Sequence, residues 1–558
     1  MKRKIMKKGL ALILCAAMTS ACMACASSAE QERGEKTASS KTSAEGKQEE
    51  GKTADSNFNE TGFPIVNDKI ELNFVFNSQT MTQDLDKLPV FQELEEKTNI
   101  HINWDICRSG WEEKKATMLA SGDLPDAFFG SGIEDSDITT NIDYFVPLED
   151  LIDEYAPNIK NLFEKDPITE KMSTFLDGHI YGLPQRMPLR PTSNDTLGIN
   201  KTWLDKLGLD VPETLDEFYD VCMAFKTQDP NGNGIADEIP FNFANLDDSR
   251  WFTARTLLGA WGDMYDMTFN YLTVKDDVVS YMPTLDSYKE LVLFLNKMYQ
   301  NGLINQEVFT DDLSKFVALG KSEDVPILGS VIAWTPGTVT GQWADQYIAI
   351  PPLRASADTE PLWGTNRSLV IYDTNKFEIT TANEHIPETM RWIDECYSEE
   401  MSLYLYYGSE GIGIQKEADG TYTILPPTSD EYDQDLWKWY NAPADFAPVA
   451  TLPETEKKIN DPTGYYAERI EMSDIYDPYL LDDKDIYPLA KFDAADQDEL
   501  TLLKTDITSY VDQKFAQWIT VGGVEEEWEN YLTELDNMGL PRMLEIYQKG
   551  YNNYYGMN

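Results

Sequence analysis

Ile70-Glu-Leu-Asn-Phe-Val-Phe76 begins the stretch that decides the fold class of this 558-residue chain, because its composition predicts a buried strand. The next segment, 88–98, has apolar residues at helical spacing, and Ile100-His-Ile-Asn-Trp-Asp-Ile106 alternates apolar and polar residues as a strand does. A short helix over 111–120 and a strand over 126–129 follow. Strands that alternate with helices predict an α/β fold with a mainly parallel sheet.

In a sheet of this kind, ligands bind outside the carboxyl ends of the strands. Three polar turns follow the predicted strands and are therefore candidate ligand contacts: Asn77-Ser-Gln79, Arg108-Ser-Gly-Trp111 and Gly130-Ser131. Downstream, the pattern predicts mostly helices, centred on the segments 148–164, 214–227, 284–300, 387–399 and 525–549.

Composition and charge narrow the class of protein. The chain is long enough for two or more domains, and 42% hydrophobic residues with 12% aromatics are typical of a globular protein. Lys and Arg number 46 against 97 Asp and Glu, which gives a net charge of −51. A chain this acidic repels a phosphate backbone, so we expect no nucleic-acid partner.

The first residues have the features of an export signal. A basic start, Met1 to Lys8, precedes the apolar run 9–18, which is too short to span a bilayer. Thr19-Ser-Ala-Cys22 then resembles the cleavage box of bacterial lipoproteins, which implies a signal peptide over 1–21 and a lipid on Cys22. Cys25 is a second candidate, and an ordinary secretory peptide is the alternative. A lipid chain would hold the protein on a membrane without a spanning helix.

Residues 22–62 are predicted to form a disordered tether, because they are rich in Ser, Lys, Glu, Gly and Ala and have few large apolar groups. The folded part then runs over 63–558. Its cysteines, 107, 222 and 396, are odd in number and far apart, so we expect small buried apolar residues and not a disulfide framework.

Five phrases in the folded part resemble the extracellular solute-binding proteins of bacterial carbohydrate ABC importers, in particular the large lipoprotein members akin to alginate-binding receptors. The phrases are Phe145-Val-Pro-Leu-Glu-Asp-Leu-Ile-Asp-Glu-Tyr-Ala-Pro-Asn158, Asp177-Gly-His-Ile-Tyr-Gly-Leu-Pro184, Ile199-Asn-Lys-Thr-Trp-Leu-Asp-Lys-Leu-Gly208, Pro212-Glu-Thr-Leu-Asp-Glu-Phe218 and Asn301-Gly-Leu-Ile-Asn-Gln-Glu307. They occur in the family's order, and the resemblance covers roughly 65–420.

The resemblance implies an α/β fold of the periplasmic-binding-protein type, with two lobes, hinge segments and a central ligand cleft. Each lobe is then discontinuous. The first would comprise about 63–183 plus about 365–430, and the second about 190–360. Helical segments over about 430–558 would be shared.

A second notable stretch is Asp229-Pro-Asn-Gly-Asn-Gly-Ile-Ala-Asp-Glu-Ile-Pro240, which follows most of the pattern of a calcium loop. Pro240 stands where such a loop has its bidentate Glu, and Glu238 is the substitute. Hard oxygen ligands suit Ca²⁺, and related receptors carry the same pattern as a structural calcium site. A metal-free turn is the alternative, since Asn-Gly pairs favour turns by themselves. The predicted ligands are Asp229, Asn231, Asn233, the backbone carbonyl of Ile235, Asp237 and Glu238.

A sugar offers flat apolar faces to aromatic rings and a rim of hydroxyls to polar side chains. The candidate ligand-binding residues are Trp111, Trp251, Trp261, Trp334 and Trp363 for the faces, and Asn77, Gln185, Arg186, Arg367 and Glu410 for the rim. For each Trp, core packing is the alternative. Arg186 and Arg367 would pair with the carboxylates of an anionic glycan.

Motifs of catalysis do not occur in the sequence: there is no HExxH, no Gly-rich phosphate loop and no G-x-S-x-G. We therefore expect a binding protein and not an enzyme. The resemblance implies a monomeric receptor, lipid-anchored at the extracellular face of the membrane, that captures an oligosaccharide and delivers it to an ABC permease. A surface glycoside hydrolase or lyase, and a receptor of the same fold for peptides, are the alternatives.

Overall fold

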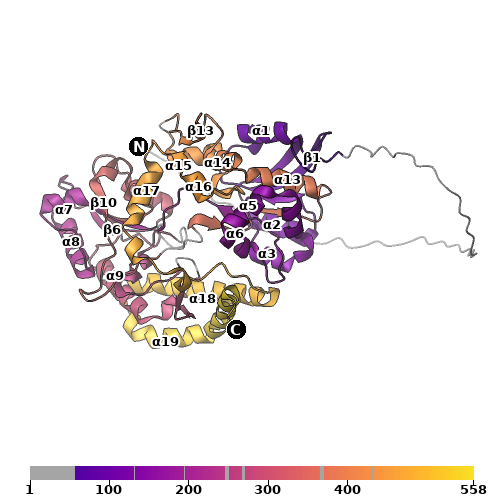
Figure 1. The fold of residues 1–558 in the computed structure, drawn as a ribbon. Helices are drawn as coiled ribbons and strands as arrows, with labels where there is room; N and C mark the ends of the chain where they lie inside the picture. The colour runs from indigo at the N-terminus through magenta and orange to yellow at the C-terminus, as the bar shows by residue number, and fades with distance from the viewer. Residues whose placement is uncertain are drawn as a thin grey trace, which may run out of the picture. The chain divides into compact units, whose positions relative to one another are not determined.

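A computed structural model describes residues 57–130, 132–193, 195–244, 251–266, 270–364, 370–429 and 431–557 (Figure 1). These residues belong to one compact unit, Ser56–Asn558. The predicted signal peptide, Cys22, Cys25 and Arg367 lie outside the described residues.

The first sheet has the strand order β12-β3-β1-β2. β1 (Ile70–Asn77) lies parallel to both β2 (Ile100–Cys107) and β3 (Ala127–Phe129), as the sequence pattern predicts. β12 (Phe377–Ile379) joins from far along the chain and runs antiparallel to β3. The carboxyl ends of β1 and β3 therefore meet at one edge of the sheet, where ligands bind in such folds.

Helices cover this sheet, and aromatic side chains fill the space between. Phe74 of β1 lies edge-on against Trp392 with 5.4 Å between ring centroids, and Trp104 contacts Phe129 at 5.1 Å. The helices are α1 (Pro89–Thr98), α2 (Trp111–Ser121), α3 (Asp135–Thr140), α4 (Glu149–Tyr155), α5 (Pro157–Lys165), α6 (Pro167–Ser173), α13 (Ile386–Cys396) and α14 (Glu399–Tyr407). The helix predicted over 148–164 is thus two helices, because Pro157 starts a new one.

The second sheet has the order β10-β5-β9-β6. β6 (Ile239–Asn242) is parallel to β9 (Leu328–Ala333), whereas β5 (Thr196–Asn200) and β10 (Tyr347–Ala349) add antiparallel pairs. The expectation of a mainly parallel sheet is wrong here. All five residues of β5 are buried, polar Thr196 and Asn200 included, and a strand buried on both faces has no alternation in its sequence that would reveal its direction.

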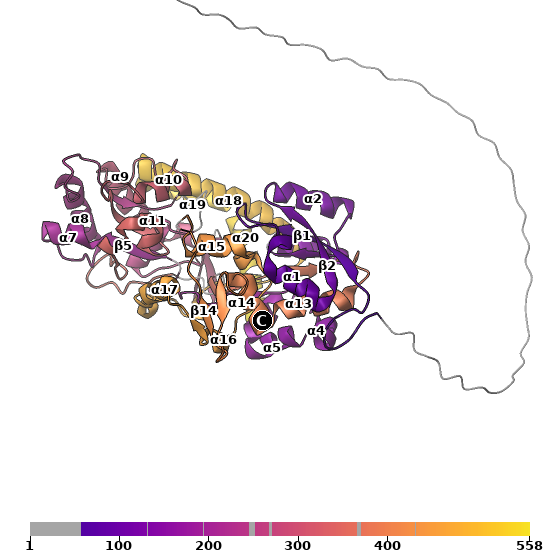
Figure 2. The ribbon, with the colours of Figure 1, turned by 90° about the horizontal axis from the view of Figure 1, so that it is seen from above.

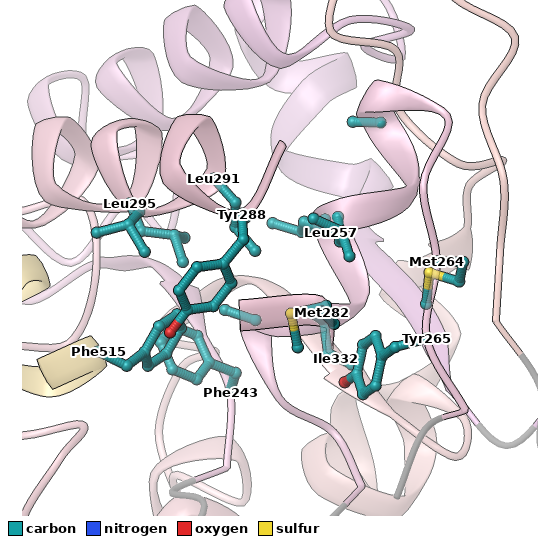
Figure 3. Packing of buried hydrophobic residues seen from close by; sticks show 14 of the residues in the cluster. Phe243, Leu257, Met264, Tyr265, Met282, Tyr288, Leu291, Leu295, Ile332 and Phe515 are labelled. Atoms are coloured by element: carbon teal, nitrogen blue, oxygen red, sulfur yellow. The ribbon is translucent and has the colours of Figure 1, made fainter. Parts of the chain in front are cut away.

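Helix α9 (Asp286–Gln300) and helices from the C-terminal part form the hydrophobic core around the second sheet (Figure 3). Tyr288, Leu291 and Leu295 point from α9 toward Phe515, whose ring stacks on that of Tyr288 at 6.0 Å. The remaining elements are α7 (Lys201–Leu207), α8 (Leu215–Thr227), β7 (Leu272–Lys275), β8 (Val278–Tyr281), α10 (Leu313–Gly320) and α11 (Pro336–Thr340). Each large apolar side chain fully buried in this way stabilises the fold by about 1.5–3 kcal/mol.

The C-terminal part is helical, but it is divided differently from the prediction. The segment 525–549 falls into α19 (Val524–Asn537) and α20 (Leu540–Tyr555), separated at Gly539, whose φ is 97°. The long helix α18 (Ala494–Thr520) was not predicted. It runs beside α9 (Figure 2) and also contacts α3. The other elements are α15 (Gln434–Asn441), α16 (Pro453–Glu456), α17 (Tyr465–Asp474), β13 (Ile414–Lys416), β14 (Tyr422–Ile424) and β15 (Ile459–Asn460).

The chain passes between the two sheets more than once. β4 (Gln185–Arg186) pairs with β11 (Tyr372–Asp373), so the segments that leave and re-enter the first sheet lie side by side. The fold is thus α/β with two sheets in two lobes, as predicted. The lobe boundaries stay a prediction. Cys107, Cys222 and Cys396 are free and buried, which confirms their predicted role.

Candidate functional site

A cavity of about 650 Å³ opens at the carboxyl ends of β1 and β3. One wall comes from the first lobe and includes Asn77, Trp111 and the segment 132–136. The opposite wall comes from the segment 487–492, from α18 and from Tyr547 of α20. The structure therefore brings Asn77 and Trp111 together, as their positions after predicted strands implied.

Trp111 is held in a fixed orientation at this wall. It begins α2, is half-buried, and its Nε1 donates a hydrogen bond of 2.9 Å to the carbonyl oxygen of Gly132. Its ring also meets Phe128 edge-on at 6.4 Å. Gly132 has a φ of 146°, and a Cβ there would lie 2.6 Å from Trp111 Nε1, so a glycine is required for the ring to lie where it does.

The opposite wall presents three aromatic side chains. Tyr487 and Tyr547 are packed edge to face at 5.3 Å, and Phe492 meets Tyr547 at 6.0 Å. Tyr487 donates its hydroxyl hydrogen to the backbone oxygen of Tyr547 at 2.8 Å. Burial raises the pKa of both tyrosines, so they stay neutral. Sequence reasoning missed these residues, and the aromatic run Tyr487-Pro-Leu-Ala-Lys-Phe492 was the available signal.

An ion pair crosses from one wall to the other. Asp135, the first residue of α3, accepts hydrogen bonds through Oδ1 from Lys491 Nζ and, at 2.8 Å, from Asn375 Nδ2. Lys491 also lies over the ring of Phe175 at 4.4 Å. The segment 487–492 is thus attached to the first lobe next to the cavity.

Beside the cavity lies a group of charged and aromatic residues that we call the Trp334 cluster: Arg190, Trp334, Asp435, Lys438, Trp439, Asp445 and Arg469. Trp334 follows strand β9 and is half-buried. The guanidinium carbons of Arg190 and Arg469 lie 5.7 Å and 5.2 Å from its ring centre. Two cations at this distance from one indole hold its orientation.

The cations of the Trp334 cluster are paired with carboxylates. Arg190 lies 2.7 Å from Asp445, Arg469 lies 2.6 Å from Asp435, and Lys438 lies 3.4 Å from each carboxylate. Burial disfavours the charged form of Asp445, but Lys438 and Arg190 outweigh it and hold its pKa below the usual range.

The Trp334 cluster connects with the cavity through one buried lysine. Lys376 Nζ donates a hydrogen bond of 2.9 Å to the backbone oxygen of Asp445. It also forms an ion pair of 2.7 Å with Asp373, which lines the cavity. Lys376 therefore links the backbone of Asp445, a member of the Trp334 cluster, to a residue of the cavity lining.

Two other predicted residues have structural partners. Gln185 is fully buried and its Nε2 donates to the carbonyl of Ala447 at 2.7 Å. Arg186 pairs with Asp166 at 3.0 Å and Glu456 at 2.8 Å. These bonds fix the crossing strand β4, and ligand contact by Gln185 and Arg186 stays a prediction.

Trp363 is 1% exposed and lies in the core of the second lobe. Its Nε1 donates to the carbonyl of Asp195 at 2.9 Å, and its ring stacks on Tyr476 at 4.6 Å. The structure therefore explains this Trp by packing, which was the alternative for each candidate. Neither ring face is open to a ligand here.

The remaining candidates lie apart from the cavity lining. Trp251 and Trp261 are half-buried against the core of the second lobe. Glu410 is exposed and accepts a hydrogen bond of 2.7 Å from Gln415 Nε2. Ligand contact by these three stays a prediction.

The acidic loop 229–240 is closed by its own side chains. Asp229 accepts from the backbone N–H of Gly232 at 2.9 Å and of Gly234 at 3.1 Å. Asn231 and Asn233 each donate from Nδ2 to Asp237 at 2.9 Å. Among the residues that the structure describes, no group of three His, Cys, Asp or Glu side chains is arranged to hold a metal.

Glu238 is the member of this loop whose environment points to a missing partner. Its Oε1 is buried and has no hydrogen-bond partner. Burial raises the pKa of Glu238, and the nearby charges of Asp237 and Asp229 raise it further. A buried oxygen without a donor is costly, and a cation would remove that cost.

Two α/β lobes, with a cavity at the carboxyl ends of the first sheet and walls from both lobes, define a solute-binding protein of the periplasmic type. The chain belongs to the bacterial extracellular solute-binding protein family, whose sequence profile matches residues 80–288.

Three comparisons support this membership. The fructooligosaccharide ABC transporter substrate-binding protein FusA of Streptococcus pneumoniae is 30% identical over 525 residues, 90% of this chain and 94% of FusA. A solved HMO-binding, ABC-transporter-associated solute-binding protein from Bifidobacterium longum infantis is 27% identical with a TM-score of 0.80, over 88% of this chain and 100% of that one. A solved FusA EF-hand mutant in complex with fructo-nystose is 29% identical with a TM-score of 0.78, over 87% and 100%.

The family and these relatives are substrate-binding proteins of ABC transporters, which confirms the prediction that the chain is not an enzyme. Helices with the length and apolar character needed to span a bilayer do not occur among the described residues.

Proposed function

We propose that the protein is a lipid-anchored extracellular receptor that captures an oligosaccharide in the cavity between its lobes and delivers it to an ABC permease. The observation that carries this proposal is the cavity itself, in which Trp111 faces a wall with Tyr487, Phe492 and Tyr547. Aromatic rings on both walls suit the flat faces of successive sugar rings, and the relatives named for fructooligosaccharides and HMO support the ligand class.

Capture depends on the difference between the ligand's affinity for the open arrangement of the two lobes and its affinity for the closed one. A ligand that touches both walls binds the closed arrangement more tightly and therefore increases its population. Lys491, which ties the second wall to Asp135, helps to hold that arrangement. The permease then recognises the closed, loaded monomer.

The test is isothermal titration of the purified protein with fructo-nystose and other oligosaccharides, followed by chromatography of the sugar. We expect binding, recovery of intact sugar, and at least about tenfold weaker binding by Trp111→Ala, since burying the apolar surface of a large side chain contributes about 1.5–3 kcal/mol. Trp343→Ala is the matched control, because Trp343 bonds Ser322 away from the cavity. Sugar cleavage would support a hydrolase, and equal losses in both variants would contradict the assigned cavity.

We also propose that the loop 229–240 holds a structural Ca²⁺. Its ligands would be Asp229, Asn231, Asn233, the backbone carbonyl of Ile235, Asp237 and Glu238. The buried, unpartnered Glu238 Oε1 supports the fit, and so does the existence of a FusA EF-hand mutant among the solved relatives. Rotating the amides of Asn231 and Asn233 would present their oxygens in place of their donors. Bound calcium would supply only charge and coordination here.

Calcium binding is tested by thermal unfolding with EDTA, Ca²⁺ or Mg²⁺. A ligand of the folded state raises the midpoint, so Ca²⁺ should raise it by several degrees after EDTA. Glu238→Gln should remove most of that rise. Asp216→Asn is the control, because Asp216 is exposed on the neighbouring helix α8. An equal response in wild type and Glu238→Gln would contradict the assignment.

The anchor is the third part of the proposal. The lipoprotein box Thr19-Ser-Ala-Cys22 supports acylation of Cys22. Cys22→Ser should move the protein from the membrane fraction to the medium, and Cys25→Ser should leave it with the membrane. The reverse result would assign the lipid to Cys25.

A further inference from the structure

We propose that Lys171, Tyr554 and Tyr555 form a latch that holds the two walls of the ligand cavity together and thereby sets how long a captured ligand is retained. The proposal rests on the proposed function, because it concerns release of the ligand from that cavity. None of these three residues lines the cavity of about 650 Å³, so the latch acts without touching the ligand.

The latch joins the two lobes. Lys171 lies on α6, which leads into Phe175 of the apolar cluster that includes residues of β1 and β3. Tyr554 and Tyr555 end α20, whose buried side chains belong to the core of the second lobe. The contact between Lys171 and the two rings therefore crosses from one lobe to the other.

The rings of the latch provide a site for the ammonium group. Lys171 Nζ lies 3.7 Å from the ring centre of Tyr554 and 5.3 Å from that of Tyr555. The two rings meet edge to face at 5.1 Å, and the Tyr555 hydroxyl donates to the backbone oxygen of Asp483 at 3.4 Å. Burial lowers the pKa of Lys171, because its ammonium is partly removed from water. An ammonium this close to an aromatic face is attracted by the charge distribution of the ring.

A second lysine crosses the same junction in the opposite direction. Lys491, from the segment 487–492, bonds Asp135 and lies 4.4 Å from the ring centre of Phe175. Between this contact and the latch lies a further cavity of about 330 Å³, lined by Lys491, Lys171 and side chains of both lobes. Contacts between cations and rings beside a cavity separate at a lower cost than a close-packed apolar core, which suits a junction that opens and closes.

The latch acts on the second wall of the ligand cavity through α20. A Cβ on Gly550 of α20 would lie 2.6 Å from a ring carbon of Phe492 and 2.8 Å from the hydroxyl oxygen of Tyr487. Tyr487 also donates a hydrogen bond to the backbone oxygen of Tyr547. Helix α20 and the segment 487–492 are thus tightly joined, and together they form the wall that faces Trp111. Holding the end of α20 holds this wall in place.

Release of the ligand then requires the latch to break. A ligand that touches both walls leaves after they separate, and separation removes the ammonium from the rings. One partly desolvated contact of this kind changes the ratio of closed to open molecules by about tenfold. Its loss should therefore accelerate dissociation by about tenfold. Association should change little, because the ligand enters the open arrangement before the latch forms.

The experiment measures association and dissociation of fructo-nystose by stopped-flow fluorescence. Lys171→Ala and Tyr554→Leu should each raise the dissociation rate about tenfold, whereas Lys171→Arg and Tyr554→Phe keep the contact and should stay within about twofold of the wild type. The Lys171→Ala/Tyr554→Leu double variant should match the single variants, since all remove one contact. Lys160→Ala is the control, because Lys160 pairs with Asp153 on the surface. A dissociation rate of Lys171→Ala equal to that of Lys160→Ala, or multiplied effects in the double variant, would overturn the latch.

A measurement without ligand separates failure of the latch from failure of the receptor function. If the wild type binds no oligosaccharide, the receptor function is contradicted, and small-angle X-ray scattering decides the latch. Lys171→Ala should then have a larger radius of gyration than Lys160→Ala, because fewer molecules hold their lobes together. Equal radii of gyration in that case would overturn the latch as well.

Discussion

The Asp445→Asn substitution is the sharpest test of the ion pairs that hold the Trp334 cluster. Asp445 is 23% exposed, and it pairs with Arg190, 11% exposed, and Lys438, 2% exposed. Its other oxygen accepts from Trp439 Nε1 at 2.9 Å. The amide keeps the shape of the side chain but removes the charge that compensates these two buried cations.

The expected loss in the free energy of unfolding of Asp445→Asn follows from these exposed fractions. Removing one partner of a buried pair costs about 3–5 kcal/mol. Asp445 is partly open to solvent, and Lys438 keeps a second carboxylate, Asp435, at 3.4 Å. We therefore expect the lower limit, a loss of about 3 kcal/mol in the free energy of unfolding.

Urea unfolding at pH 7 measures this loss as a lower midpoint with an unchanged slope. Asp153→Asn is the control, and it should leave the midpoint unchanged because its pair is on the surface. The folded pKa of Asp445 is lowered, so its contribution is present above pH ~4 and is lost as the pH falls further. A midpoint for Asp445→Asn equal to that of Asp153→Asn would refute the reasoning.

Three further predictions concern stability. Thr214→Ala removes the oxygen that caps α8 through Glu217 N–H at 3.2 Å, and should lower the free energy of unfolding by about 1 kcal/mol in urea. Gly259→Ala would place a Cβ 1.8 Å from the carbonyl oxygen of Leu362, so a loss of about 3 kcal/mol should appear as a lower midpoint. Burial raises the pKa of Asp195 to about 6. Because the buried carboxyl is more stable when protonated, its contribution to the free energy of unfolding of the wild type should decrease as the pH rises from ~4 to 6, and Asp195→Asn should lack that decrease. Parallel profiles of the free energy of unfolding against pH would contradict this.

Sequence reasoning succeeded where a local pattern was sufficient. The strands and helices between 70 and 129 were predicted nearly as observed, because their apolar residues recur with the period of each element. The position of Trp111 and Asn77 at the cavity was predicted because the polar ends of parallel strands meet at one edge of a sheet, and ligand contact by both stays a prediction.

Sequence reasoning failed where the role of a residue depended on distant parts of the chain. The opposite wall comes from Tyr487, Phe492 and Tyr547, which lie hundreds of residues after Trp111. Their aromatic character does not reveal whether they face a core or a cavity. Trp363 shows the converse, since a candidate chosen by residue type is a core residue stacked on Tyr476, which was the alternative for each Trp.

The sequence by itself determined the α/β class, the export signal as an expectation, and the family resemblance, because each depends on composition, periodicity or short ordered phrases. Tertiary structure alone decided the direction of β5, the walls of the cavity and the pairing of its charges. The physical reason is that burial and ion pairing are properties of neighbours in space. Arg186 looks available to a glycan until Asp166 and Glu456 are seen to hold it.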